Sequence, residues 1–217
     1  MAGESRYELL ETVGTGRYTT VYRARDRELN REVAIKQLRD EFTGGTLQMD
    51  RYWQEAQLLA SLQHPNIVTI YDINRQKGWL VMELMQGTLA ERLAGRQMDL
   101  RALKTTLAHS LRALHYLHDR GIVHGDIKPS NIMIDARRRI KLGDFGLART
   151  LVKDLSLTQS GQFLGSPSFA SPEQVKGDAM DERTDMMMMS EERTKPAPCA
   201  KAGPFRATMI GLNILRW

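Results

Sequence analysis

Residues 124–131 read HGDIKPSN, and residues 143–149 read GDFGLAR. Each stretch offers one carboxylate in a tight loop between apolar residues, and Asn131 adds an amide oxygen. Oxygen ligands of this kind suit Mg²⁺, which keeps phosphate oxygens in the rest of its shell. The pattern therefore predicts a magnesium site made by Asn131 and Asp144. Asp126 is left over as the candidate base for an attacking hydroxyl group.

A glycine-containing turn lies near the N-terminus, where residues 13–21 read VGTGRYTTV. Gly14 and Gly16 allow the backbone to approach phosphate oxygens and to point N–H groups at them. Taken alone, the two glycines also fit a plain hairpin turn. A dinucleotide-binding loop would be followed by a helix, and it would carry a third glycine where this chain has Thr19. The β-like residues 21–24 therefore exclude a dinucleotide-dependent enzyme.

A lysine closes the next apolar strand, where residues 33–36 read VAIK. The simplest interpretation of Lys36 is a charged residue on an edge strand. Its functional interpretation is a cation aimed at phosphates, and Glu55 in the following helix is the carboxylate expected to hold Lys36. The order and spacing of all four motifs favour the functional interpretation.

Hydrophobic spacing predicts the elements around these motifs. Leucines at steps of three and four residues over residues 100–117 form one apolar face of a long helix that ends at Gly121. A second helix is predicted over residues 48–63, and a long polar loop over 147–170. Short strands are predicted at residues 7–10, 20–24, 33–36, 67–71, 79–83, 132–134 and 140–142.

Together these motifs resemble the catalytic domain of serine/threonine protein kinases, of the eukaryotic-like type that bacteria also carry. The resemblance runs from about Tyr7 to about Asp185, and it includes HPNIV at residues 64–68 and SPE at residues 171–173. It implies an α+β fold with two lobes. The small lobe would be an antiparallel sheet with one helix, and the large lobe would be mainly helical and lack its last helices.

The resemblance implies transfer of the ATP γ-phosphoryl group to Ser or Thr hydroxyls of a protein substrate, with Mg²⁺ held by Asn131 and Asp144. The residues implied to act in the transfer are Asp126, Lys128, Lys36 and its partner Glu55. Lys128 resembles the lysine of serine/threonine rather than tyrosine kinases. The residues implied to bind ATP are Val13, Gly14, Thr15, Gly16, Val21, Ala34, Lys36, Met82, Glu83, Met85 and Met133. Four residues resemble the apolar column that links the lobes: Leu59, Ile70, His124 and Phe145.

One departure from the kinase pattern concerns regulation. Gly125 stands where the family usually has an arginine, and that arginine pairs with a phosphate group on the activation loop. We therefore expect activity that is not switched in that way, although Ser156, Thr158 and Ser160 are candidate phosphosites.

The pattern changes after Asp185, where four methionines are followed by a polar stretch. We expect a small ATP-binding lobe over residues 7–85, a partial large lobe over 86–185, and a tail over 186–217 that is unstructured and not of kinase origin. A truncated or frame-shifted reading would explain this tail. The alternative function is a kinase-like module that binds ATP or a protein partner without turnover.

Composition adds limits on location and partners. The formal net charge is +5, and residues 186–217 contribute +3 of it. The sequence contains no basic stripe interleaved with aromatic residues, so it does not predict nucleic-acid binding. No apolar run approaches the ~18 residues of a membrane span, and residues 1–10 do not form a signal peptide. The single cysteine, Cys199, fits a reducing compartment, so we expect a cytoplasmic protein.

Overall fold

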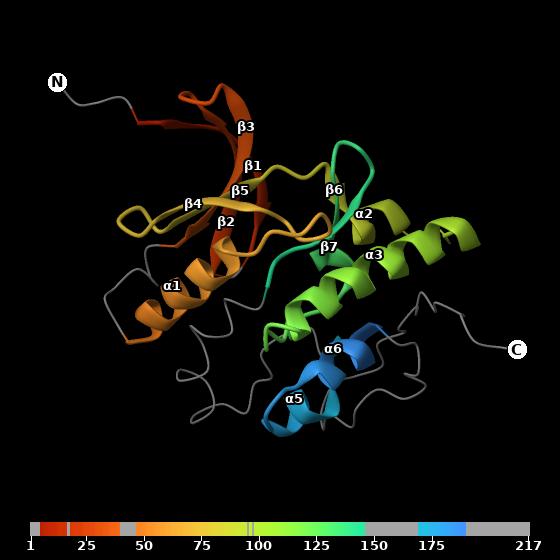
Figure 1. Cartoon of the computed structure of the whole chain (residues 1–217). Coiled ribbons are helices and arrows are strands. Elements are labelled where there is room, and N and C mark those ends of the chain that lie inside the picture. Colours follow the sequence, from red (N-terminus) through yellow and green to blue (C-terminus); the bar gives the residue numbers. More distant parts are fainter. Residues whose placement is uncertain are drawn as a thin grey trace, which may run out of the picture.

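The computed structural model describes residues 5–16, 18–39, 47–94, 96, 98–145 and 169–189, and these form a two-lobed α+β fold (Figure 1). Along the chain the elements are β1 (Tyr7–Thr15), β2 (Thr19–Asp26), β3 (Arg31–Leu38), α1 (Leu47–Ala60), β4 (Ile70–Asn74), β5 (Trp79–Glu83), β6 (Gly87–Thr88), α2 (Leu89–Leu93), α3 (Leu100–His118), the 3-10 helix η2 (Pro129–Asn131), β7 (Ile132–Ile134), β8 (Ile140–Leu142), α5 (Pro172–Lys176) and α6 (Glu182–Met189). The expected two-lobed fold is confirmed.

The small lobe is an antiparallel sheet with the strand order β1-β2-β3-β5-β4, and α1 packs beside β4. Alternation along β3 sorts its side chains to two faces. Val33 and Ile35 join Trp79 in one apolar cluster, while Leu38 belongs to the main core. Because Lys36 is two residues from Leu38, it shares the face that is turned toward the rest of the molecule.

The main core continues from one lobe into the other. Tyr52 and Leu59 of α1 belong to the same buried cluster as Leu114 and Leu117 of α3 and Leu142 of β8. In the large lobe, β6, β7 and β8 form a second antiparallel sheet beside α3, and α5 and α6 lie below α3 in Figure 1. Because this core spans both lobes, it fixes the position of one lobe relative to the other.

Most predicted elements are confirmed, three of them residue for residue: β5, β7 and β8. The helix α3 ends at His118, three residues before the predicted end at Gly121, and α1 ends at Ala60 rather than at residue 63. The strand predicted over 67–71 begins only at Ile70, because Ile67 instead bridges to Leu142 of the other sheet. The short elements β6, α2, η2 and α5 were not predicted.

The tail expected from residue 186 needs a correction, because α6 continues through Met189. Met188 and Met189 pack against the main core, and the Met188 sulfur accepts a hydrogen bond from the Ile127 amide at 3.3 Å. Methionine is a good helix former with a flexible side chain that fills irregular gaps, so a run of methionines can serve as a buried helix face.

Several other expectations lie outside the described residues. These are the polar loop from residue 147 to 168, Gly146, the candidate phosphosites Ser156, Thr158 and Ser160, and residues 190–217 with Cys199. Within the part of the chain that the structure describes, no helix has both the length and the apolar character that a membrane crossing requires.

Candidate active site

The register of the small sheet aligns the residues predicted for ATP in two rows across the strands. Gly14 pairs with Val21, which pairs with Lys36. In the next row, Ala34 pairs with Met82 at the end of β5. A sheet therefore brings together residues that are far apart in the sequence, and the glycine turn lies at one end of the first row.

The glycine turn is closed by a hydrogen bond from the Gly16 amide to the Thr19 carbonyl at 2.8 Å. Val13, Thr15 and Gly16 are exposed at this end of β1. A Cβ atom on Gly14 would lie 4.0 Å from Val21 Cβ, and one on Gly16 would lie 3.5 Å from the Thr19 oxygen, both ordinary contacts. Packing against the described residues does not require glycine at either position, and backbone approach to a ligand stays a prediction.

In the loop before η2, two of the predicted residues, Lys128 and Asn131, lie against the carboxylate of a third, Asp126. Lys128 Nζ donates to Asp126 Oδ2 at 2.8 Å, and Asn131 Nδ2 donates to the same oxygen at 2.8 Å. Asn131 Nδ2 also donates to the Asp126 carbonyl at 2.8 Å. The Asp126 side chain keeps 22% of its surface exposed, so it is held in place and still accessible.

Asp144 follows β8 and forms an ion pair with Lys36 across the two lobes. Its backbone has a φ of 55°, a left-handed conformation that is uncommon outside glycine and that asparagine and aspartate adopt more often than other residues. Partial burial raises the pKa of Asp144, but the charge and hydrogen bond of Lys36, with the charge of Lys128, outweigh it and lower the pKa. Asp144 is therefore a carboxylate at neutral pH.

Glu55 lies on α1 with an exposed side chain, and its pairing with Lys36 stays a prediction. Of the four residues of the predicted column, His124 and Phe145 are in direct contact, and the complete column stays a prediction. Leu59, Ile70 and Phe145 pack in the main core, and the rings of His124 and Phe145 lie 4.6 Å apart.

The helix α6 anchors the loop that carries Asp126 through the side chain of Asp185. This fully buried carboxylate accepts hydrogen bonds from the His124 amide at 2.8 Å and the Gly125 amide at 2.7 Å. His118 Nε2 lies 2.9 Å from the same carboxylate. On the neighbouring helix, Glu173 accepts a hydrogen bond from the Thr184 hydroxyl, which is the first cause of its lowered pKa.

The segment between the lobes contains a buried ion pair that the motif analysis missed. Lys141 of β8 is 4% exposed, and its Nζ donates to Glu83 Oε2 at 2.7 Å and to the Ile67 carbonyl at 3.4 Å. A lysine in the middle of the apolar strand IKL was the signal that could have revealed it. Nearby, Met85 is half-buried and Met133 pairs with Thr88 across β6 and β7.

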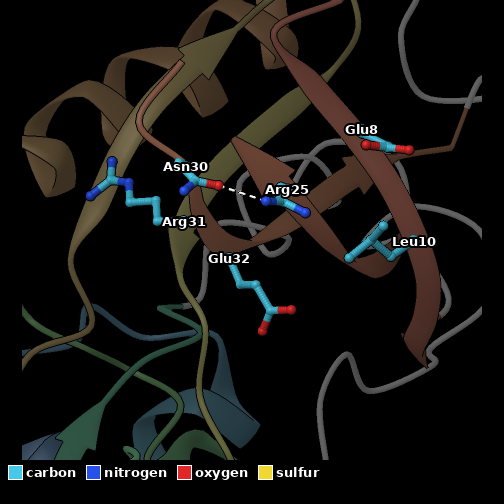
Figure 2. A pocket seen from close by; sticks show the side chains of 6 residues that line it. All are labelled: Glu8, Leu10, Arg25, Asn30, Arg31 and Glu32. Carbon is cyan, nitrogen blue, oxygen red and sulfur yellow. Dashed lines mark hydrogen bonds between the residues drawn. The ribbon is translucent and has the colours of Figure 1, made fainter. Parts of the chain in front are cut away.

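A hollow of about 390 Å³ lies at the far end of β1, β2 and β3 (Figure 2). Its lining residues are Glu8, Leu10, Arg25, Asn30, Arg31 and Glu32. Arg25 donates to the Asn30 side chain at 2.6 Å. Glu8 pairs with Arg25 across the strands, at the opposite end of the sheet from the row of Gly14, Val21 and Lys36. This hollow is therefore separate from the candidate active site.

Comparisons with known proteins agree with this geometry. The family model described as the protein kinase domain matches residues 7–190. The chain is 36% identical over 190 residues to the serine/threonine-protein kinase PknB of Mycobacterium leprae, covering 83% of this chain and 30% of that protein. It is 40% identical over 191 residues to the probable serine/threonine-protein kinase SCO3848 of Streptomyces coelicolor, covering 83% and 28%.

A third relative is the probable serine/threonine-protein kinase CPE1738 of Clostridium perfringens, 36% identical over 189 residues, with 84% of this chain and 27% of that protein covered. The chain thus spans less than a third of the length of these relatives. The family match includes the four methionines at residues 186–189, in agreement with the structure of α6.

Proposed function

The chain belongs to the protein kinase family, and on that premise we propose that it transfers the γ-phosphoryl group of ATP to Ser or Thr hydroxyls of a protein. The observation that carries the proposal is the convergence of five charged or polar residues from both lobes: Lys36, Asp126, Lys128, Asn131 and Asp144. Phosphoryl transfer needs little covalent chemistry from a protein, so a set of groups that positions and neutralises phosphates is sufficient.

ATP would lie between the small sheet and the large lobe. The row Gly14, Val21 and Lys36 supports a phosphate site below the glycine turn. Val21 and Ala34 from the small lobe, with Met133 from the large lobe, would sandwich the adenine ring, and Met82 would lie at the back of its pocket. The backbones of Glu83 and Met85 would provide the polar contacts to adenine.

The donor set also fits a magnesium ion. Because the Asn131 amide nitrogen is bonded to Asp126, its oxygen is the atom left for a cation. The Asp144 carboxylate is ionised and 40% exposed, so it can serve as the second protein ligand. When bound, Mg²⁺ would neutralise charge on the ATP phosphates.

Asp126 is the residue that we assign to the acceptor hydroxyl. Its carboxylate would orient the hydroxyl and accept its proton, because it is ordered by two donors and remains accessible. Lys128 is ion-paired with it and would lie beside the transferred phosphoryl group. We also place this activity in the cytoplasm, on the support of the single cysteine in the chain.

The test is an autophosphorylation assay with labelled ATP and Mg²⁺, followed by phosphoamino-acid analysis. Asp126→Ala should lower the transfer rate by about 100-fold or more, because it removes the positioned acceptor of the proton. Asp119→Asn is the matched control, since Asp119 is an exposed carboxylate at the end of α3 and should leave transfer unchanged. A folded chain that binds ATP with Mg²⁺ but transfers no phosphate would support the alternative, a binding module, and label on tyrosine alone would contradict Ser/Thr specificity.

A further inference from the structure

Gln174 on α5 reaches the loop that carries Asp126. Its Nε2 atom donates to the Gly125 carbonyl at 2.7 Å and lies 3.2 Å from the Met180 sulfur. Its Oε1 atom accepts a hydrogen bond from the Ser171 amide at 3.0 Å. Each end of this amide group has a partner of the right kind, so the orientation that presents Nε2 to Gly125 is fixed.

The Gly125 carbonyl belongs to the peptide group that joins Gly125 to Asp126. The other end of the same peptide group, the Asp126 amide, donates to His124 Nδ1 at 3.3 Å. The preceding peptide group is held by Asp185, which accepts from the Gly125 amide at 2.7 Å. The two peptide groups on either side of Gly125 are thus bonded to three different residues.

These bonds act at the most flexible position of the loop. Gly125 has a φ of 71°, and glycine passes between backbone conformations more readily than any other residue. Rotation of the peptide group after Gly125 would turn the backbone of Asp126 and carry its carboxylate away from Lys128 and Asn131. Of these three bonds, the one from Gln174 acts on the oxygen end of that peptide group.

We propose that Gln174 is a positioning residue for Asp126, acting by fixing the peptide group between Gly125 and Asp126. This inference rests on the proposed function, because it assigns Asp126 its place in phosphoryl transfer. It also couples α5, which follows residues 146–168 in the chain, to the catalytic carboxylate.

Three variants separate positioning from a merely structural role. Gln174→Glu has the same shape and keeps the acceptor for the Ser171 amide, but it replaces the donor to Gly125 with a carboxylate oxygen. Gln174→Met removes the donor without adding charge. Ser171→Ala is the matched control. It removes the hydroxyl that accepts a hydrogen bond from the Gln174 backbone amide at 3.3 Å, and it leaves the bond between the Gln174 side chain and the Gly125 carbonyl in place.

The first measurement is hydrogen exchange of the full chain, read on peptides that cover residues 124–128 and, as a reference, residues 31–38. Both Gln174 variants should speed exchange at residues 124–128 by about ten-fold and leave the reference unchanged. They should also lower kcat by about ten-fold or more with KM for MgATP within about two-fold, since a misplacement of ~1 Å can cost about 100-fold in rate.

Unchanged exchange at residues 124–128 in both Gln174 variants would overturn the proposal. An equal effect of Ser171→Ala on exchange and kcat would overturn it as well, because the cause would then be the stability of α5. A wild-type chain that transfers no phosphate would contradict the proposed function alone, and the exchange measurement would still decide the role of Gln174.

Discussion

At the scale of single residues, His124 is a buried histidine whose two ring nitrogens have opposite roles. Nδ1 accepts a hydrogen bond from the Asp126 amide at 3.3 Å, and Nε2 lies 3.2 Å from the Gly143 carbonyl, to which it donates. Only the neutral ring can make both bonds. Burial lowers the pKa of His124, and this effect outweighs the raising effect of the nearby carboxylates of Asp185 and Asp126. The unfolded chain therefore binds a proton at a higher pH than the folded chain.

Stability should fall as the pH drops below the unfolded pKa of about 6.5, until the folded pKa is reached. Between these two pKa values, the protonation of His124 should lower the free energy of unfolding by about 1.4 kcal/mol per pH unit. Urea unfolding at several pH values between 7.5 and 5.5 measures the slope, and His124→Gln should have a smaller one. Equal slopes for the two proteins would show that His124 is not the group responsible.

At the scale of elements, α6 holds the loop of residues 124–131 through one carboxylate. Asp185 is fully buried, and its two oxygens accept from the His124 and Gly125 amides. Asp185→Asn leaves one acceptor oxygen and turns an N–H₂ group toward a donor, so one buried amide loses its partner. The free energy of unfolding should fall by about 1–3 kcal/mol.

Asp181→Asn, just before the same helix, is the control for that prediction. Asp181 is 43% exposed and pairs with Arg183 at the surface, where ion pairs contribute about 0–1 kcal/mol. Chemical unfolding of both variants checks the difference. If the Asp181 variant lost as much stability as the Asp185 variant, the two buried amides would not be the cause.

At the scale of the whole molecule, the ion pair between Lys141 and Glu83 joins the sheets of the two lobes. Backbone bonds lie beside it, because the Val68 amide donates to the Leu142 carbonyl and the Leu142 amide donates to the Asn66 carbonyl, each at 2.8 Å. Lys141→Met would leave the Glu83 carboxylate, only 18% exposed, without its partner. Removing one member of a buried ion pair lowers the free energy of unfolding by about 3–5 kcal/mol. Because Glu83 is partly exposed, we expect a loss of about 3 kcal/mol.

The double variant Lys141→Met with Glu83→Gln should regain most of that loss, because no buried charge remains unpaired. Equilibrium unfolding of the wild type, both single variants and the double variant gives the interaction energy. Because the main core spans both lobes, each variant should unfold in one transition. Two separate transitions would show that the lobes do not share a core.

Sequence alone determined the elements whose signals are local. The apolar runs of β5, β7 and β8 and the leucine spacing of α3 predicted their positions, because periodic burial depends on neighbouring residues. The motifs also predicted Lys36, Asp126, Lys128, Asn131 and Asp144, which the fold brings together. Each motif carries its chemistry within a few residues, so its identity could be read before its neighbours in space were known.

Tertiary structure alone decided which distant residues support that site. Lys141 meets Glu83 across 58 positions, and Gln174 meets Gly125 across 49. Neither pair has a spacing or a motif that predicts it, because each contact exists only after two lobes, or a helix and a loop, have packed together. The same reason explains residues 186–189, whose polar-flanked methionines look irregular in the sequence. They become the last turn of α6, where Met188 and Met189 are partly buried against the core.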